Sequence, residues 1–599
     1  MINKKVKNVL RQRISELRNQ MVEAGLDGWI IGREDMFQGG EGPESEERLA
    51  FISGFTGSSG IAIIFSKTAL LFSDGRYSLQ MTDQVDPSIW ECSTPAENNL
   101  NNWLSGIQFK ADMLIGADGT LFNVKAFKKM ELAIRKHGGA TLKNHENLID
   151  KIWENRPKKH SRLPWIMPSQ IAGKTTRKKI KELETVVRSK SCDAVLLTRA
   201  DSVNWLLNVR GSDLFHTPIN LCFALLAPGS GLYVIECSEG LKELLPARIK
   251  QSTIKELGKL LNKLSIRNLM IETESLPYSI YLQIESYNIS MSDYDCPVRA
   301  IKAKKSRPEI KGFKTAHHKD GLAMAEFLSW FEAVNKREFS ESMIAAKLDY
   351  FRKVQPGYLA SSFATIAGSG PNGAIVHYRA VPGADRYFQD NDLLLLDSGG
   401  HYREGTTDVT RTIVVGKPTK DMTEAYTTVL RAQINLVSTI FPTGTTGQQL
   451  DSLARMSLWR KRMDFAHGTG HGVGHVMSVH EGPVSISKRC CKALEPGMVL
   501  SVEPGYYRRG EWGIRIENLV VVKPCVSVDG GGESESFLEF ETLTFCPYDR
   551  GLISVKQMKE EEIDWINSYH QKVYKKLQKD LSTKAREWLI RATRPMVKI

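Results

Sequence analysis

Hydrophobic positions recur with two different periods along this chain, so both helices and strands are predicted. Near the start, Val6, Leu10, Ile14 and Leu17 lie three or four residues apart, which predicts a surface helix that opens a domain. Short apolar runs such as AGLDGWII follow and predict strands. We therefore expect a mixed fold of the α/β and α+β classes.

Two stretches of the chain share one plan. In each, a strand precedes a polar stretch, an aromatic and aliphatic segment ends in a glycine turn, and two strands follow that are joined by a short loop. This repetition predicts two α/β domains of related design. The first stretch contains AGLDGWII, RLAFISGFTGSSGIAIIF and ALLFSDGRY, and the second contains KSCDAVLLTRADSVNWLLNVRGSD and LCFALLAPGSGLYVIE.

Proline-containing, strongly charged segments near 155–165 and 299–309 separate these stretches from each other and from the rest. Because 599 residues exceed what one hydrophobic core supports, several domains are expected. We predict three, at 1–155, 156–305 and 306–599. In the third, helices are expected at 311–334, 340–354, 422–440 and 446–462, strands at 392–400, 406–415, 497–507 and 513–522, and a docked helix pair at 560–590.

Composition narrows the class of protein. Hydrophobic residues make up 41% of the chain and charged residues 25%, and no apolar run is long enough for a membrane span. The basic start lacks the apolar stretch of a secretory signal, and the nine cysteines show no CxxC spacing. A net charge of +13 is spread over helices and linkers such as RAIKAKKSRPEIK, which predicts a solvated surface rather than nucleic-acid binding. We expect a cytoplasmic protein.

Five residues of the third domain could form a metal site. Each of the four acids ends or interrupts an apolar strand, where an ionised side chain is costly unless a cation neutralises it. Four carboxylates and one imidazole suit Mn²⁺, Co²⁺ or Zn²⁺, and five ligands exceed what one tetrahedral ion takes, so two ions are expected. The candidate ligands are Asp397, Asp408, His471, Glu503 and Glu517.

Each of these acids alone is more often an ordinary turn or salt-bridge residue, and the prediction depends on all five together. His467, His471 and His475 add to it, since they lie four residues apart. The glycines between 468 and 482 prevent a regular helix and predict a loop or bent strand. Only some of the three histidines would then reach the ions, with His475 in a structural role.

These residues and their surroundings resemble the creatinase and methionine-aminopeptidase, or pita-bread, family, and within it the three-domain cytosolic aminopeptidases P, or Xaa-Pro aminopeptidases. The resemblance covers nearly the whole chain and implies two related creatinase-N-like α/β domains followed by a C-terminal pita-bread catalytic domain. The ligand positions keep the family's order, with ten residues between the aspartates and thirteen between the glutamates. The matching motifs are GFTGSSG, LFSDGRY, NWLLNVRGSD, GPNGAIVHY, LLLDSGGHYREGTTDVTRT, HGTGHGVGH, SVEPGYY and GIRIEN.

The resemblance implies a role for each ligand. Asp397 would hold one ion, His471 and Glu503 the other, and Asp408 and Glu517 would bridge both. A hydroxide shared by the two metals would attack the N-terminal Xaa-Pro bond, which makes the chain a metal-dependent exopeptidase acting on peptides with proline in second position. Family habit and carboxylate content favour Mn²⁺, with Co²⁺ or Zn²⁺ as alternatives.

Further residues take roles from the resemblance. Glu503 is expected to be the general base, while His377 and His480 would contact substrate, stabilise the oxyanion and assist proton transfer. An isolated histidine is more often structural, so these two assignments depend on their motifs. His467 is expected to line the proline pocket.

Two arginines carry alternative assignments. Arg515 could orient Asp397 or another ligand, or contact substrate. In the family a partner subunit helps to close the site, so a homodimer is implied and Arg76 could reach the peptide there; serving its own domain is the alternative for Arg76. The stretch MFQGGEGP departs from the family pattern, which leaves open how the first domain meets a long peptide.

Two other functions compete with this prediction. A prolidase shares the fold and the ligands but cleaves only Xaa-Pro dipeptides, and the SDGRY and NWLLNVRGSD segments of two N-terminal domains favour aminopeptidase P. A non-catalytic pita-bread protein that binds histones or other partners is the alternative from another class. Such proteins lose metal ligands, whereas this chain keeps all five.

Overall fold

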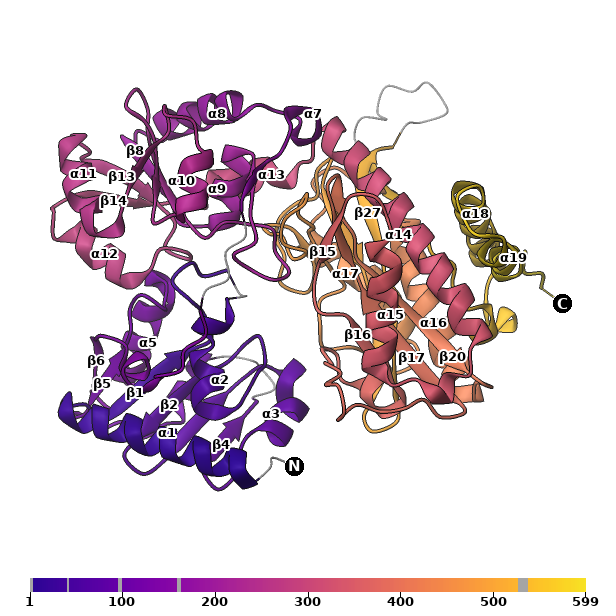
Figure 1. The fold of residues 1–599 in the computed structure, drawn as a ribbon, viewed down its shortest axis with the longest axis horizontal. Helices are drawn as coiled ribbons and strands as arrows, with labels where there is room; N and C mark the ends of the chain where they lie inside the picture. Colours follow the sequence, from indigo (N-terminus) through magenta and orange to yellow (C-terminus); the bar gives the residue numbers. More distant parts are fainter. Residues whose placement is uncertain (1–3, 40–41, 95–99, 159–162, 526–536, 599) are drawn as a thin grey trace. The chain divides into compact units, whose positions relative to one another are not determined.

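The computed structural model, drawn as a ribbon in Figure 1, describes residues 4–39, 42–94, 100–158, 163–525 and 537–598. The chain divides into two compact units. Unit 1 comprises Met1–Ile166, Thr175–Phe215 and Ile219–Val298, and unit 2 comprises Met167–Lys174, His216–Pro218 and Arg299–Ile599. None of the described helices combines the length and apolar character that a membrane crossing requires.

The described part of unit 1 contains two six-stranded sheets and the two-stranded pair β7-β9, and the first six-stranded sheet has the strand order β4-β3-β2-β1-β5-β6. β1, β2 and β3 are antiparallel neighbours, while β4, β5 and β6 join the sheet in parallel. The predicted opening helix, α1, buries Leu10, Ile14 and Leu17. The elements are α1 (Lys4–Glu23), β1 (Gly28–Gly32), η1 (Glu44–Glu46), α2 (Arg48–Ser53), β2 (Ile61–Phe65), β3 (Ala69–Phe72), η2 (Gly75–Tyr77), α3 (Ser78–Gln84), β4 (Trp90–Ser93), α4 (Leu100–Ser105), β5 (Leu114–Ala117), α5 (Val124–Lys136), β6 (Thr141–Asn144) and α6 (Leu148–Ile152).

The second sheet repeats this topology, with the order β12-β11-β10-β8-β13-β14. Its antiparallel and parallel pairings follow the same sequence, so the prediction of two related α/β designs is confirmed. The elements are β7 (Trp165–Ile166), α8 (Thr176–Ser189), β8 (Ala194–Leu197), α9 (Ala200–Leu207), β9 (Val209–Arg210), β10 (Phe223–Ala227), β11 (Gly231–Ile235), α10 (Glu239–Leu244), β12 (Lys250–Ser252), η3 (Ile254–Glu256), α11 (Leu257–Lys263), β13 (Asn268–Ile271), α12 (Tyr278–Glu285), β14 (Ser290–Asp293) and α13 (Pro297–Ala303).

Residues from the first half of unit 1 enter the core of the second sheet. Phe37 and Val124 belong to the same buried hydrophobic cluster as the residues of β8, β10 and β13. The ring of Phe37 lies 4.9 Å from that of Phe223, centroid to centroid. Phe37 is part of the MFQGGEGP stretch, so this departure from the family pattern has a packing role; Gly40 and Glu41 of the stretch lie outside the described residues.

Unit 2 packs long helices against several antiparallel sheets. β16-β17-β20 form one sheet, β21-β28-β27-β24 another and β15-β18-β19 a third, with further two-stranded pairs β22-β23 and β25-β26. The elements are α7 (Ser169–Ala172), α14 (Arg307–Ala333), η4 (Lys336–Glu338), α15 (Glu341–Lys353), β15 (Tyr358–Ser361), β16 (Ile366–Ser369), η5 (Gly370–Ala374), β17 (Asp392–Ser398), β18 (Gly400–Tyr402), β19 (Gly405–Thr406), β20 (Val409–Val415), α16 (Lys420–Val437), β21 (Phe441–Pro442), α17 (Gly447–Trp459), β22 (Gly470–His471), β23 (Ser485–Ile486), β24 (Val499–Val502), β25 (Gly505–Arg508), β26 (Trp512–Arg515), β27 (Asn518–Pro524), β28 (Phe537–Thr542), η7 (Arg550–Leu552), η8 (Val555–Gln557), α18 (Glu560–Leu577) and α19 (Thr583–Ala592).

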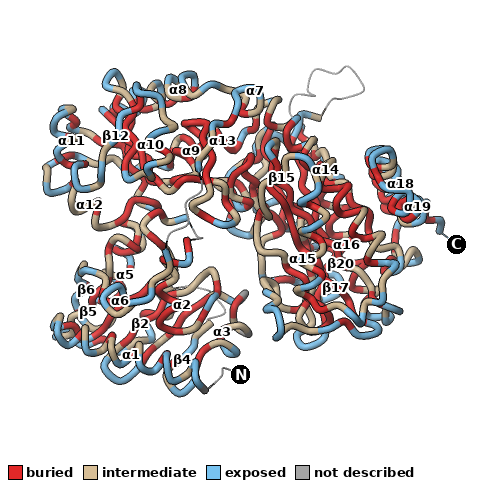
Figure 2. The backbone as a smooth tube through the Cα atoms, viewed as in Figure 1, coloured by how far each residue is buried: buried red, intermediate tan, exposed pale blue. Residues whose placement is uncertain are grey.

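The core of unit 2 is built from the apolar runs that predicted its strands and helices. Every residue of β17 is buried, and Leu394 and Leu396 share one cluster with residues of α14, α16 and the C-terminal α18 and α19. Figure 2 shows buried residues along the strands and inner helices of this unit. The predicted helices, strands and docked C-terminal helix pair of this region are confirmed, whereas the boundaries at 155/156 and 305/306 stay predictions.

One expectation about charge is wrong in part. The segment RAIKAKKSRPEIK was expected to be a solvated linker, yet Lys302 and Lys305 are 2% and 6% exposed. Lys305 donates its backbone N–H to Gly497 O, and both ammonium groups pair with the buried Glu481 at 3.3 and 2.6 Å. The backbone of Lys305 thus pairs with the chain just before β24, and the side chains of Lys302 and Lys305 point into the protein.

Candidate metal centre

Antiparallel pairing brings the two candidate aspartates together. Asp397 lies near the end of β17 and is in register with Thr410 of β20, while Asp408 immediately precedes β20. In an antiparallel pair the end of one strand lies beside the start of the next. The ten residues between the two aspartates therefore leave the end of β17 and return to the start of β20, next to Asp397. Both aspartates are buried, at 8% and 4% exposure.

His471 and Glu503 are brought together by the pairing of β22 with the chain at β24. The Glu503 N–H donates to Thr469 O at 2.8 Å, and the His471 N–H donates to Ser501 Oγ at 3.0 Å. A Cβ atom on Gly470 would lie 1.9 Å from Ser501 O, so only glycine permits this approach. The predicted loop or bent strand is confirmed, and the glycine at position 470 has a steric cause.

Glu517 reaches the same place from the turn between β26 and β27. Its N–H donates to Thr410 O at 3.1 Å, and the Thr410 hydroxyl donates to Glu517 Oε2 at 2.9 Å. Thr410 is also the residue in register with Asp397. The strand β20 therefore links both acids through one threonine.

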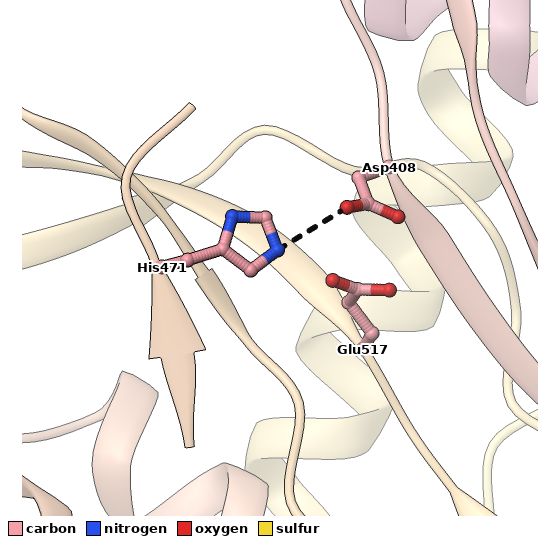
Figure 3. A group of neighbouring side chains, drawn as sticks. All are labelled: Asp408, His471 and Glu517. Atoms are coloured by element: carbon pink, nitrogen blue, oxygen red, sulfur yellow. Dashed lines mark ion pairs between the residues drawn. The ribbon is translucent and has the colours of Figure 1, made fainter. Parts of the chain in front are cut away.

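The side chains of Asp408, His471 and Glu517 point toward one another (Figure 3), and one ligand atom from each lies within 4.8 Å of the others. His471 Nε2 is 3.5 Å from both Asp408 Oδ2 and Glu503 Oε1. His471 Nδ1 bonds Gly472 O at 3.0 Å, and because a carbonyl only accepts, Nδ1 carries the proton in the neutral ring. Nε2 then presents its lone pair to the carboxylates, as a metal ligand does.

The buried acids of the cluster have raised pKa values, as expected for carboxylates whose charges a cation would neutralise. Burial, followed by the charges of Asp397 and Glu503, raises the pKa of Asp408 well above its ordinary value. Burial and the same kind of repulsion raise the pKa of Glu517, and burial raises that of Glu503 against the opposing effects of His471 and Arg515. Like charges this close cannot all ionise without compensation.

Unpartnered oxygens give an independent test of fit. Among the described residues, Asp397 Oδ1, Asp408 Oδ1 and Glu517 Oε1 are buried and have no hydrogen-bond partner. Buried polar atoms are nearly always satisfied, so three orphaned carboxylate oxygens beside one imidazole lone pair fit divalent metal ions. Three of the five ligands expected from the sequence, Asp408, His471 and Glu517, thus form one candidate metal group.

A chain of hydrogen bonds leads away from Asp397. Arg515 donates to Asp397 Oδ2 at 2.6 Å and to the Tyr507 hydroxyl at 2.7 Å, and that hydroxyl lies 2.7 Å from His467 Nε2. Burial, and then the Arg515 charge, lowers the pKa of His467 to about 3, so this ring is neutral. Arg515 thus contacts Asp397 directly, whereas His467 is connected to Arg515 only through the Tyr507 hydroxyl.

The remaining predicted residues differ in how far they approach the cluster. The imidazoles of His480 and His471 meet edge to face, with centroids 4.2 Å apart. His377 is near enough to His467 that its charge contributes to the lowered pKa of that ring. His475 bonds Glu404 O at 2.7 Å, in keeping with a structural role. Arg76 lies in η2, and its side chain is outside the described part of the structure.

Tyr507, which joins His467 to Arg515, was not among the residues predicted from the sequence. Its position four residues after Glu503, within the quoted SVEPGYY motif, was the available indication.

The chain matches four models of known protein families. Residues 311–524 match the model of metallopeptidase family M24 and 536–596 that of its C-terminal region, while 13–152 and 155–309 each match a creatinase/prolidase N-terminal domain. A Neurospora crassa protein named "Probable Xaa-Pro aminopeptidase P" is 34% identical over 97% of this chain and 89% of its own length.

Two solved structures are similar as well. The X-prolyl aminopeptidase of Caenorhabditis elegans, described as a cytosolic enzyme with a di-nuclear active site, is 30% identical with a TM-score of 0.90, covering 98% of this chain and all of its own. The Xaa-Pro dipeptidase of Bacillus anthracis is 27% identical with a TM-score of 0.50, covering 63% of this chain and 99% of its own. The predicted family and fold class are confirmed. With two creatinase-type N-terminal domains, an M24 domain and near full-length relatives, the chain belongs to metallopeptidase family M24 and, within it, to the Xaa-Pro aminopeptidase P group.

Proposed function

We propose that this chain is a metal-dependent exopeptidase that hydrolyses the N-terminal Xaa-Pro bond of peptides. One observation carries the proposal: Asp408, His471 and Glu517 each offer a ligand atom within 4.8 Å of the others, and among the described residues Asp408 Oδ1 and Glu517 Oε1 are buried without a hydrogen-bond partner. The names of the curated and structural relatives supply the substrate class. Proline specificity rests on those relatives.

The ligand roles expected from the sequence are part of the proposal. Asp397 would hold one ion, His471 and Glu503 the other, and Asp408 and Glu517 would contact both. Two bound divalent cations would supply an activated water, whose pKa falls to about 7 in favourable sites, and would polarise the scissile carbonyl. Arg515, bonded to Asp397 Oδ2, would fix the orientation of that carboxylate and leave Oδ1 for a cation.

Three residues of the chain would move or stabilise charge. Glu503 would accept the proton of the attacking water, and its Oε1 is held by the Ser501 hydroxyl at 3.1 Å. His480, stacked edge to face on His471, and His377 would donate hydrogen bonds to the developing oxyanion and assist proton transfer to the leaving proline nitrogen. A proton donor is required because the leaving nitrogen takes the electron pair of the broken C–N bond and departs as a neutral amine only when it gains a proton.

The test is to strip metal from the protein, restore Mn²⁺, Co²⁺ or Zn²⁺ separately, and follow release of the first amino acid. An Xaa-Pro-Xaa tripeptide should be cleaved only by the restored protein, and an Xaa-Ala-Xaa tripeptide should be cleaved far more slowly. Equal rates on both tripeptides would contradict the proline assignment. Cleavage at the full rate by the metal-free protein would contradict the metal assignment.

An Xaa-Pro dipeptide in the same assay separates this proposal from prolidase activity. The Bacillus anthracis dipeptidase covers only 63% of this chain, which favours the aminopeptidase. Cleavage of the dipeptide but not the tripeptide would reverse this preference. Inactivity on every peptide, together with unchanged behaviour of an Asp408→Ala variant, would favour the non-catalytic alternative.

Three finer points remain within the proposal. Mn²⁺ is proposed as the native ion because the donor set is rich in carboxylates. A cytosolic location is proposed because the Caenorhabditis elegans relative is described as cytosolic. A homodimer, with Arg76 near the peptide, is proposed from the family resemblance, and its mass in solution can be measured by light scattering.

A further inference from the structure

A carboxylate outside the metal cluster is buried as completely as any within it. Glu341, the first residue of α15, has no exposed surface. Its side chain makes five hydrogen-bond contacts with four groups, because one side-chain amide contacts both oxygens. The other groups are two backbone N–H groups and a phenol hydroxyl, and all four can donate. Only a group that accepts at both oxygens satisfies such a set.

Ser369 is the last residue of β16, and the other donors belong to the segment that connects β16 to β17. Glu341 Oε1 accepts from the Ser369 N–H at 2.6 Å and from Asn372 Nδ2 at 3.1 Å. Oε2 accepts from the Tyr378 hydroxyl at 2.6 Å and from the Arg386 N–H at 3.1 Å. One carboxylate thus holds the beginning, middle and end of a long connection that has little regular structure of its own.

His377 lies in this connection, between two anchors. Val376, immediately before it, has its carbonyl 3.4 Å from Arg515 Nη2, the same nitrogen that bonds Asp397. Tyr378, immediately after it, bonds Glu341. The backbone on one side of His377 is therefore tied to the metal cluster, and the side chain on the other side is tied to the start of α15.

We propose that Glu341 is a positioning residue for His377, and this inference rests on the proposed function. By holding Ser369, Asn372 and Tyr378 at once, the carboxylate sets the distance between the His377 imidazole and the metal cluster. Errors of about 1 Å in such a group cost on the order of 10²-fold in rate. Glu341 itself does not touch the reacting atoms.

Glu341→Gln tests the proposal with almost no change of volume. In either orientation the amide nitrogen faces N–H or O–H donors, so part of the network breaks and the connection shifts. We expect kcat on an Xaa-Pro-Xaa peptide to fall by about 10-fold or more, with KM little changed and the bound metal per chain equal to that of the wild type.

A double-mutant cycle with His377→Ala separates positioning from general damage. We expect His377→Ala alone to lower kcat by about 10²-fold, and Glu341→Gln to lower it by less than about 2-fold when added to that variant. Losses that multiply instead would show that Glu341 acts independently of His377 and would overturn the proposal. An unchanged kcat in folded Glu341→Gln would overturn it as well.

Two further variants keep the test decisive. If Glu341→Gln does not fold, Tyr378→Phe removes only the hydroxyl that bonds Glu341, and the same cycle applies with a smaller expected loss of about 3-fold or more. Glu309→Gln is the matched control, since Glu309 is a buried acid that caps α14 through Ser306 and glutamine also serves in such a cap. It should retain wild-type kcat. A wild type inactive on the peptide would count against the proposed function, whereas an active wild type with multiplicative losses would count only against Glu341.

Discussion

At the scale of single residues, the defining feature is a set of buried acids held close to one another. The folded chain raises the pKa of Asp408 and Glu517 because burial and neighbouring carboxylates both oppose ionisation. Water would relieve this repulsion only by entering a site whose walls are apolar strands. Divalent cations relieve this repulsion directly. The rest of the fold must hold the acids together against their repulsion, and metal binding therefore stabilises the folded state.

The first prediction concerns pH. The folded pKa of these acids lies above the unfolded value of about 4, so between the two values the folded state holds protons that the unfolded state has lost. Stability of the metal-free protein conferred by these groups is therefore present at low pH and is lost as pH rises through the folded pKa. Cations bind the ionised acids, so the rise in melting temperature on adding Mn²⁺ should be larger at about pH 8 than at about pH 5.5. A larger rise at the lower pH would contradict this account.

The second prediction concerns Asp408→Asn. Removing one central charge should raise the melting temperature of the metal-free protein, because Glu517 and Glu503 lose a like-charged neighbour. The same change removes a ligand, and a loss of several kcal/mol of transition-state stabilisation corresponds to about 10³-fold or more in kcat/KM. Thermal unfolding in EDTA and peptide hydrolysis with Mn²⁺ measure the two effects. A variant that is both less stable without metal and fully active would refute the ligand role.

At the scale of elements, the site depends on short strands that pack closely at a glycine. β22 lies against β24 with no room for a side chain at Gly470, because the Ser501 carbonyl occupies the place of its Cβ. Gly468, two residues earlier, has only ordinary contacts of 3.4 Å or more at the same position. The two glycines therefore offer a matched pair.

The third prediction uses this pair. Gly470→Ala must push β22 away from β24, which displaces His471 and costs about 1–3 kcal/mol of stability. We expect a lower melting temperature and less bound metal per chain. Gly468→Ala should change both quantities little. Similar losses in the two variants would indicate a general intolerance of this segment rather than the specific contact.

Much of this element structure could be predicted from the sequence, for a physical reason. Runs such as DLLLLD and GIRIEN place acids at the ends of strands that must be buried, so strand and candidate ligand follow from the same local pattern. Glu341, Arg411 and the inward-facing Lys302 have no such local pattern. Their partners lie far along the chain, and polar contacts of this kind leave no periodicity in sequence.

Arg411 of β20 shows what the sequence could not indicate. This residue is 1% exposed, and its guanidinium donates to Thr410 O, Glu517 O, Asn518 Oδ1, Cys546 O, Pro547 O and the Tyr569 hydroxyl. Two of these acceptors lie at Glu517 and the residue after it, and Tyr569 belongs to α18. One arginine thus joins the backbone at Glu517 to the C-terminal helix α18.

At the scale of the whole molecule, unit 2 is completed by its last helices. Ile563, Ile566, Tyr569, Val573 and Leu577 of α18 belong to the main hydrophobic cluster, together with residues of α14 and α16. Burying five such side chains contributes about 1.5–3 kcal/mol each, which is comparable with the about 5–15 kcal/mol by which whole domains are stable.

The fourth prediction follows for truncation. A chain that ends before Glu560 should fail to form a soluble catalytic unit, because it exposes this cluster and leaves Arg411 without the Tyr569 hydroxyl. Removal of Val597 and the residues after it is the control, since Val597 is 72% exposed and its loss should leave the melting temperature unchanged. A soluble, active protein lacking α18 and α19 would contradict the assigned role of these helices.

The insertion of Phe37 and Val124 into the core around β8, β10 and β13 has a consequence for how unit 1 comes apart. Two separate copies of one topology would melt independently, each at its own temperature. Here any opening of the second sheet must also expose the aromatic ring of Phe37, which comes from the chain segment after β1. Slow amide protons in β1 and β8 should therefore exchange with deuterium at a common rate, as members of one cooperative block.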